Sequence, residues 1–184
     1  MSTQKFGDGI RVSLQEIPAL AQRHFPMCMQ HLYGTLMADR HLRHAGRQQF
    51  GLFLKKAGLT LEESMLFWKS SFAPRTSAEK FEKEYAYNIR HSYGKEGRRK
   101  DYEAQKCSQI ISATPGVGEA NGCPFKTFDK DALKVALGRT GLPNGCVPCP
   151  LALQTAAAAY GISHNFFHSS EANSPLLLLP SARG

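Results

Sequence analysis

The sequence predicts a mainly α-helical fold with long loops around its cysteines, and three observations carry this prediction. Two capping boxes, Ser13-Leu-Gln-Glu16 and Thr60-Leu-Glu-Glu63, mark helix starts, because the paired side chains can satisfy backbone N–H groups of a first turn. Apolar residues recur at helical spacing after these starts. Prolines and glycines gather instead at 112–122 and 142–150, beside the later cysteines, and predict loops there.

The individual helices follow from these signals. A short helix is expected after Ser13, ending near Phe25-Pro26, and Pro26 suits the first position of the next helix. Further helices are expected to begin near His44, after Thr60 and at Ala78, with short ones over 129–137 and 150–160. The expected apolar faces are Met29, Leu32 and Leu36; Phe50, Phe53, Leu54 and Ala57; Leu61, Met65, Trp68 and Phe72; and Phe81, Tyr85 and Ile89.

Length and charge bound the function. At 184 residues the chain can hold a hydrophobic core, as one domain or as two small lobes. A net charge of +8 favours a polyanionic partner. No apolar run approaches membrane-spanning length, so we expect no membrane partner. Residues 1–11 lack the apolar segment of a signal peptide and are expected to be an N-terminal tail or the start of a fragment.

The segment His41-Leu-Arg-His-Ala-Gly-Arg47 is the first candidate for an anion site. It holds two histidines and two arginines just before an apolar helical pattern. A helix N-terminus attracts anions, and arginine adds a planar fork for phosphate oxygens. Between Arg23 and Lys56 there are six Lys or Arg and four His against one acid, Asp39. The alternative is a solvated basic face, but the local charge imbalance favours phosphate binding.

A second candidate surface lies at the end of the Ala78 helix. Aromatic residues alternate there with Asn, Arg and His, a pattern that suits stacking and hydrogen bonding to nucleic acid. Tyr85 and Ile89 could instead simply face the core. The following segment, 94–100, reads Gly-Lys-Glu-Gly-Arg-Arg-Lys and is either a second phosphate contact or a solvated turn.

Five cysteines, at positions 28, 107, 123, 146 and 149, argue against a disulfide scaffold because their number is odd and no secretory signal precedes them. Cys146 and Cys149 have metal-ligand spacing, and Cys123-Pro124 is a pairing found at iron–sulfur ligands. Cys28 falls in a first helical turn, where the helix dipole favours a thiolate. Spacing alone leaves an iron–sulfur cluster, a zinc site and ordinary thiols open.

Several segments taken together resemble one family, the C-terminal iron–sulfur domain of the eukaryotic DNA primase large subunit. The resemblance runs in order from about Val12 to Phe125. It is carried by Phe25-Pro-Met-Cys28-Met, His41-Leu-Arg-His44-Ala-Gly-Arg47, Gly58-Leu-Thr-Leu-Glu-Glu63, Tyr87-Asn88-Ile-Arg90-His91-Ser-Tyr-Gly-Lys95 and Gly122-Cys123-Pro-Phe125.

The resemblance implies a two-lobed helical domain over 12–184, with lobes of about 12–106 and 107–184, organised around a [4Fe–4S] cluster. By position, Cys28, Cys107 and Cys123 match three ligands and Cys149 the fourth, with Cys146 as its rival. The residues that match nucleic-acid or triphosphate contacts are His41, Arg43, His44, Arg47, Lys55, Tyr85, Tyr87 and Asn88. Ala45 stands where the family usually has glycine.

The function implied by the resemblance is non-catalytic. Such a domain is expected to bind the 5′-triphosphate end of an RNA primer paired to template DNA with a 3′ overhang, and to support initiation and length control. The expected partners are the small primase subunit, which would hold the active site of this DNA-directed RNA polymerase, and the DNA polymerase alpha complex, in the nucleus. Two alternatives are a domain whose cluster switches DNA affinity by a redox change and a zinc-stapled RNA-binding module.

Overall fold

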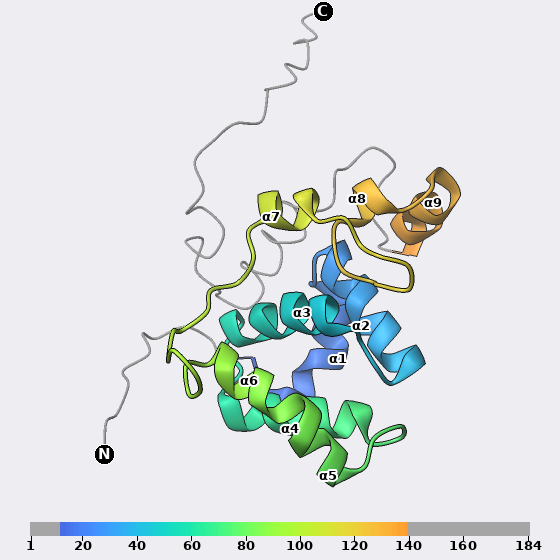
Figure 1. Ribbon diagram of the computed structural model, residues 1–184. Helices are drawn as coiled ribbons and strands as arrows, with labels where there is room; N and C mark the ends of the chain where they lie inside the picture. The colour runs from blue at the N-terminus through green and yellow to red at the C-terminus, as the bar shows by residue number, and fades with distance from the viewer. Residues whose placement is uncertain (1–11, 140–184) are drawn as a thin grey trace, which may run out of the picture.

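The computed structural model describes residues 12–139, and their secondary structure is helical apart from one isolated bridge between Tyr93 and Asp101. The mainly α prediction is therefore confirmed for these residues (Figure 1). The elements are η1 (Leu14–Glu16), α1 (Ile17–Arg23), α2 (Met27–Asp39), α3 (His44–Lys56), α4 (Leu61–Phe72), α5 (Ala78–Phe81), η2 (Glu82–Ala86), α6 (Tyr87–Ser92), α7 (Cys107–Ser112), α8 (Pro124–Thr127) and α9 (Lys130–Arg139). The tail at 1–11, the expected helix over 150–160, Cys146 and Cys149 lie outside the described residues.

Both capping boxes form as the sequence predicts. The backbone N–H and the hydroxyl of Ser13 donate to the Glu16 carboxylate at 2.9 and 2.8 Å. The corresponding groups of Thr60 donate to Glu63, whose backbone N–H donates back to the Thr60 hydroxyl at 3.2 Å. These bonds satisfy N–H groups that would otherwise lack partners at a helix start. Pro26 lies one position earlier than predicted, as the residue capping α2.

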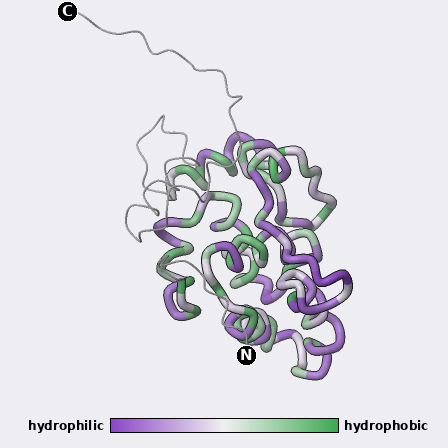
Figure 2. The backbone as a smooth tube through the Cα atoms, turned by 90° about the vertical axis from the view of Figure 1, so that its left-hand side faces the viewer, coloured by the Kyte–Doolittle hydropathy of each residue, from purple (hydrophilic) through white to green (hydrophobic). Residues whose placement is uncertain are grey.

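The core is centred on α3. Phe50 of this helix is completely buried. Its ring centroid lies between 6.0 and 6.4 Å from five other aromatic rings, those of Phe25, Tyr33, Phe53, Phe67 and Trp68. These rings come from α2, α3, α4 and the turn before α2, so α3 is enclosed by its neighbours. Figure 2 shows hydrophobic and hydrophilic residues alternating along the helices, as amphipathic packing requires.

The predicted helix from Ala78 contains one wider turn. It runs as α5, the π-helical turn η2 and α6 without a break in direction of the chain. A π-helical turn inserts one extra residue per turn and so changes which side chains face inward. Phe81 and Ala86 are buried and Tyr85 is half-buried, whereas Tyr87 is 48% exposed. Tyr85 therefore faces inward and Tyr87 outward, as expected for two residues that are two positions apart in a helix.

Helices α7 and α8 lie above α2 and α3 in the view of Figure 1. Ile110 of α7 is 5% exposed and belongs to the same apolar cluster as Cys28 of α2, while Cys123 packs against that cluster. The rings of His31 and Phe128 meet edge to face at 4.8 Å and join α2 to the residue after α8. The cysteine-bearing segments are thus packed onto the helical core.

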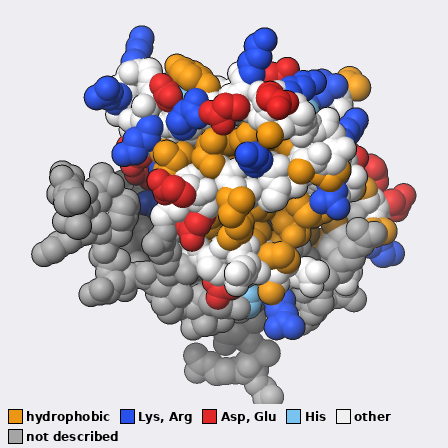
Figure 3. All heavy atoms as spheres, turned by 90° about the horizontal axis from the view of Figure 1, so that it is seen from below, with side chains coloured by type: hydrophobic (Ala, Val, Ile, Leu, Met, Phe, Trp, Pro, Cys, Tyr) orange, Lys and Arg blue, Asp and Glu red, His pale blue; other side chains and the backbone are white. Residues whose placement is uncertain are grey.

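The surface also carries apolar residues. In the view from below, hydrophobic side chains gather near the centre of the face, with charged side chains around them (Figure 3). Among the described residues, no helix is both long enough and apolar enough to cross a membrane.

We predict that Trp68→Ala lowers the free energy of unfolding by about 3–5 kcal/mol, because it removes a large aromatic side chain from a packed core. Trp68 is 2% exposed and contacts Phe50, Phe67 and Phe72. Chemical denaturation of the two proteins measures the difference. Leu66→Ala on the same helix is the control, since Leu66 is 56% exposed, and it should cost about 0.5 kcal/mol or less. Equal losses for the two variants would contradict this account of the core.

Candidate anion and nucleic-acid site

The first turn of α3 is an uncapped helix N-terminus with cations around it. Arg43 is the capping residue, in an extended conformation, and its side chain accepts no hydrogen bond from the first turn, nor does any other side chain of residues 12–139 show one. That turn contains no acidic residue either, unlike α4, where Thr60 caps the helix and Glu62 and Glu63 follow. Backbone N–H groups there are available to an anion, and the helix dipole adds a partial positive charge.

Arg47 lies in α3, one turn after Arg43, and its side chain reaches Tyr85 of the π-turn. Its guanidinium stacks over the ring of Tyr85 at 4.8 Å from the centroid and donates to the Leu42 carbonyl at 2.6 Å. Burial lowers the pKa of Arg47 from its usual value, although a guanidinium stays protonated at any physiological pH. The side chain is therefore held in one orientation, with its charge only partly solvated.

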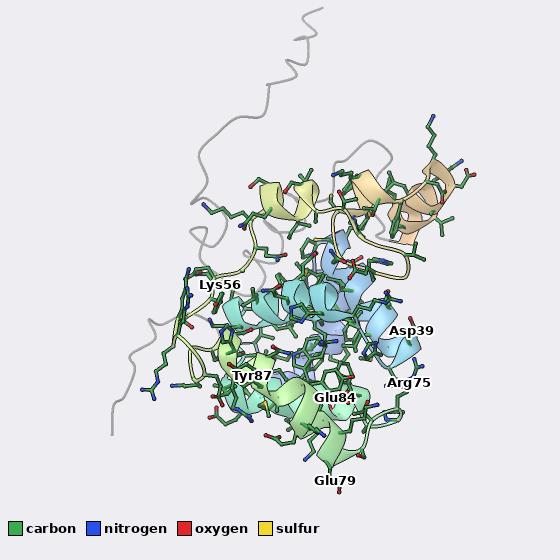
Figure 4. All side chains as sticks on the ribbon, in the orientation of Figure 1. Asp39, Lys56, Arg75, Glu79, Glu84 and Tyr87 are labelled. Atoms are coloured by element: carbon green, nitrogen blue, oxygen red, sulfur yellow. The ribbon has the colours of Figure 1, made fainter. Side chains whose placement is uncertain are left out.

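His41 completes this group at the hydroxyl end of Tyr85. Its Nε2 lies 3.5 Å from the Tyr85 hydroxyl, and its ring packs against Phe72 at 5.6 Å. Burial is the main cause that lowers the pKa of His41, followed by the positive charges of Arg47, Arg75 and Arg43. His41 is therefore neutral at pH 7. Arg75 itself donates to the Asp39 carbonyl at 2.7 Å, and the two residues lie side by side in Figure 4.

A cavity of about 230 Å³ opens beside this group. It is smaller than the ~300–1,000 Å³ typical of pockets for drug-sized ligands, so it suits one part of a larger ligand. Among the described residues that line it, none is acidic. Its lining is His44, Arg47, Gln48, Gly51, Ser64, Trp68, Phe72, Tyr85, Asn88, Ile89, His91, Ser92, Tyr93 and Tyr102.

Three sequence-predicted residues lie at the edge of this site. Arg43 is exposed, and within the described chain its guanidinium lies against Gly118 rather than in a hydrogen bond. Asn88 is exposed at the cavity. Tyr87, labelled in Figure 4, stacks on His91 at 6.0 Å and presents an exposed aromatic face outside the cavity lining.

The three described cysteines lie in neighbouring segments near the start of α2. Cys28 and Cys107 are each in the first turn of a helix, and Cys123 is the residue that caps α8. None of the three forms a disulfide. Within residues 12–139 there is no group of three or more His, Cys, Asp or Glu side chains arranged to hold a metal ion.

The surroundings of Cys28 oppose the expected thiolate as long as the sulfur binds no metal. Burial raises the pKa of Cys28 to about 12, and the nearby sulfurs of Cys107 and Cys123 add to that rise. Cys28 is 6% exposed, and the cost of desolvating its charged form outweighs the stabilisation of a thiolate by the helix dipole. The same observation indicates that the three sulfurs lie near one another.

Comparison with known proteins identifies the family. Residues 18–148 match the family model for the C-terminal domain of the large subunit of eukaryotic and archaeal DNA primase. The chain belongs to this family. The match includes Cys146 and ends one residue before Cys149.

Similar proteins agree with this family. A probable DNA primase large subunit of Arabidopsis thaliana is 50% identical over 131 residues, which cover 71% of this chain and 29% of that protein. The human DNA primase large subunit is 48% identical over 138 residues, or 74% of this chain and 27% of that protein. That of Saccharomyces cerevisiae is 41% identical over 117 residues, or 62% and 22%. The matched part thus spans less than a third of the length of these relatives.

Lys55 of this primase-family domain is separated from the first turn of α3 by roughly 16 Å along the helix axis. Its ammonium group donates to Asp101 Oδ1 at 2.5 Å, to the Tyr102 carbonyl at 2.6 Å and to the Ser92 carbonyl at 2.9 Å. The three N–H groups of the Lys55 ammonium thus have three acceptors, and these lie on both sides of the basic turn at 94–100. In this structure Lys55 therefore holds the two ends of that turn close to each other. The structure does not bring it together with Arg43 and His44.

Sequence reasoning missed several residues of the cavity wall. Trp68 is predicted only as part of a core stripe and Ser64 as part of no motif, although both line the cavity. Ser64 is 1% exposed, and a small polar residue on a buried helical face is the signal that could have indicated a site there. Gln48 and Tyr102 carry no local pattern, and only the fold brings them to this cavity.

We predict that Lys55→Met exposes the basic turn to trypsin. The variant removes the Lys55 donor from the Tyr102 carbonyl and leaves the Ser92 carbonyl with only the Tyr102 N–H at 3.3 Å. The base of the turn should therefore open, and cleavage after Arg98, Arg99 or Lys100 should become faster. Mass spectrometry of a digestion time course measures these cuts.

Lys56→Met is the matched control. Its ammonium group forms an ion pair with Glu103 at 3.3 Å, and both side chains are substantially exposed, so it should change the cleavage rate little. Equal rates for the Lys55 and Lys56 variants would contradict the assigned role of Lys55.

Proposed function

We propose that this domain holds the 5′-triphosphate end of an RNA primer paired to template DNA, and that it does so at the first turn of α3. The single observation that carries the proposal is the uncapped helix start, which has no acid in its first turn and has Arg43, His44 and Arg47 around it. A triphosphate is the densest charge that an RNA end offers. Backbone N–H groups, a helix dipole and arginine forks are the groups that recognise such a charge.

The surrounding surface suits the nucleic acid that continues from that end. Tyr87 and Asn88 are exposed on α6 beside the cavity, and an aromatic face can stack on an unpaired base of a template 3′ overhang. Tyr85 contacts no nucleic acid in this proposal and instead supports Arg47 with its ring and His41 with its hydroxyl. The exposed cations at Lys95, Arg98, Arg99 and Lys100 add contacts to the phosphate backbone that do not depend on sequence.

We infer that a [4Fe–4S] cluster joins the segments that carry the cysteines, held by Cys28, Cys107, Cys123 and Cys149. The proposal is supported by three thiols from separate segments, none in a disulfide, that lie near one another at one end of the core. Helix N-termini also favour the negative charge of a thiolate-ligated cluster. When bound, such a cluster supplies a covalent link between distant parts of the chain.

The role in replication follows from the family and is part of the proposal. The domain would support initiation and length control of primers without catalysing synthesis, together with the small primase subunit, which would hold the active site, and the DNA polymerase alpha complex in the nucleus.

We predict that binding depends on the chemistry of the 5′ end. A duplex whose RNA strand ends in 5′-triphosphate should bind about a hundredfold more tightly than the same duplex ending in 5′-hydroxyl, because charge-assisted hydrogen bonds contribute about 1.5–3 kcal/mol each. Arg43→Ala and Arg47→Lys should each reduce this preference. Fluorescence anisotropy at two salt concentrations measures it.

Arg98→Ala is the control on the basic turn. It should weaken binding to both ends alike and reduce the salt dependence, as expected for a backbone phosphate contact. Equal binding of the two ends by the unmodified protein would mean that α3 makes only a general charge contact.

A further prediction concerns the cysteines. Cys28→Ser, Cys107→Ser, Cys123→Ser and Cys149→Ser should each lose the brown colour of anaerobically purified protein and much of its stability, since ligand binding contributes directly to folding. Cys146→Ser should keep both. Visible absorption with iron and sulfide analysis measures the outcome. Bleaching by Cys146→Ser but not by Cys149→Ser would reverse the fourth ligand, and a colourless protein containing zinc would replace the cluster by a zinc site.

A further inference from the structure

The segment 113–122 joins α7, which begins with Cys107, to Cys123, the residue that caps α8. It begins where α7 ends at Ser112 and finishes one residue before Cys123. The turn at its centre is closed by two hydrogen bonds. The Glu119 N–H donates to the Gly116 carbonyl at 3.0 Å, and the Gly116 N–H donates to the Glu119 carboxylate at 2.9 Å. The segment therefore has a defined shape, although nothing in its sequence pattern assigns it a function.

Gln49 of α3 fixes the far end of this segment. Its side chain is 2% exposed, and both ends of its amide are used on one residue. The Gly122 N–H donates to Gln49 Oε1 at 2.8 Å, and Gln49 Nε2 lies 3.5 Å from the Gly122 carbonyl oxygen. A buried amide that meets a donor and an acceptor of the same residue sets both the position and the direction of the backbone there.

The middle of the segment lies against Arg43. Gly118 has φ +75°, and a Cβ built on it would lie 3.3 Å from Arg43 Nη2 and 3.6 Å from Cζ. The guanidinium therefore rests on the backbone at Gly118. Glycine accommodates both the left-handed conformation and this close approach without strain, whereas a Cβ would displace the guanidinium.

From these contacts we infer that the segment 113–122 is a positioning element of the anion site, which directs the Arg43 guanidinium and is itself held to α3 by Gln49. The inference rests on the proposed function. An exposed arginine loses side-chain entropy when it grips a ligand, and a backbone surface that already restricts its orientation reduces that loss. Gln49 and Gly118 do not contact the phosphate in this account, and they act through Arg43.

The test compares two alanine substitutions in the same turn of the 184-residue protein. Gly118→Ala introduces a Cβ against the Arg43 guanidinium. Gly116→Ala places its Cβ at an ordinary distance, 3.5 Å from the end of the flexible Glu119 side chain. The readout is the ratio of affinities for 5′-triphosphate and 5′-hydroxyl duplexes. Gly118→Ala should lower this ratio about tenfold, the size of one charge-assisted hydrogen bond, and should leave 5′-hydroxyl binding unchanged. Gly116→Ala should keep the ratio within about twofold.

A second pair of variants tests the anchor. Gln49→Met keeps the length of the side chain and removes both polar contacts, and it should lower the same ratio. Gln22→Met, at an exposed glutamine of α1, is its control and should not. Thermal unfolding reports whether each variant folds. If Gly118→Ala fails to fold, the affinity ratio of Gln49→Met tests the positioning role instead, because that variant leaves Gly118 unchanged.

The outcomes separate this inference from the function on which it rests. No triphosphate preference in the unmodified protein overturns the proposed function. A normal preference in the unmodified protein that survives both Gly118→Ala and Gln49→Met overturns the positioning role. An equal loss in Gly116→Ala and Gly118→Ala also overturns it, because the effect would then come from the turn in general and not from contact with Arg43.

Discussion

The burial of Phe50 at the centre of the aromatic cluster determines how the rest of the molecule is arranged. Because five rings from neighbouring elements surround it, α3 cannot rotate or slide without opening the core. Gly46 permits the close packing of α3 on α2, since a Cβ there would lie 3.2 Å from the Leu32 side chain. A helix fixed in this way presents its N-terminal turn to solvent in a single orientation. Rigid placement of that kind is what a binding site requires.

The charges of the molecule divide into those that are paired and those that are left for a ligand. Arg90 is paired with Glu82 and Glu96, and Lys55 with Asp101, so these cations stabilise the α6 region and the basic turn. The first turn of α3 differs because it has no acid and no cap. A cluster of like charges destabilises a fold modestly unless a counter-charge arrives. This contrast, more than the overall net charge, supports an anion site at α3.

The helices and the anion segment could be predicted from sequence because their signals are local. The capping boxes at Ser13 and Thr60 required only neighbours three residues away, and both were confirmed. Of the predicted apolar face of α4, Trp68 and Phe72 are buried, whereas Leu61 and Met65 are half-buried. The helix predicted to begin near His44 was confirmed in the same way, whereas the missing cap at its start was seen only in the structure. The π-turn before Tyr87 was not predicted, because one extra residue in a turn leaves no periodic signal in so short a helix.

Contacts between distant residues could not be predicted from sequence. The bond between Gln49 and Gly122 spans 73 positions, and that between Lys55 and Asp101 spans 46. Neither Gln49 nor Asp101 belongs to a motif, so no pattern indicates its partner. The family resemblance places Lys55 at the triphosphate site, and its three acceptors become visible only when the basic turn folds back on α3. Burial of Cys28 is equally a property of the assembled core.

The central claim is that the first turn of α3 receives the terminal triphosphate. The most direct measurement is amide chemical-shift mapping of the isotopically labelled protein with two duplexes that differ only in a 5′-triphosphate or a 5′-hydroxyl. The account predicts that the difference between the two spectra is concentrated in the backbone amides of His44, Ala45, Gly46 and Arg47, with smaller and equal changes over residues 94–100. A difference concentrated in the basic turn, with the α3 amides unchanged, would contradict it.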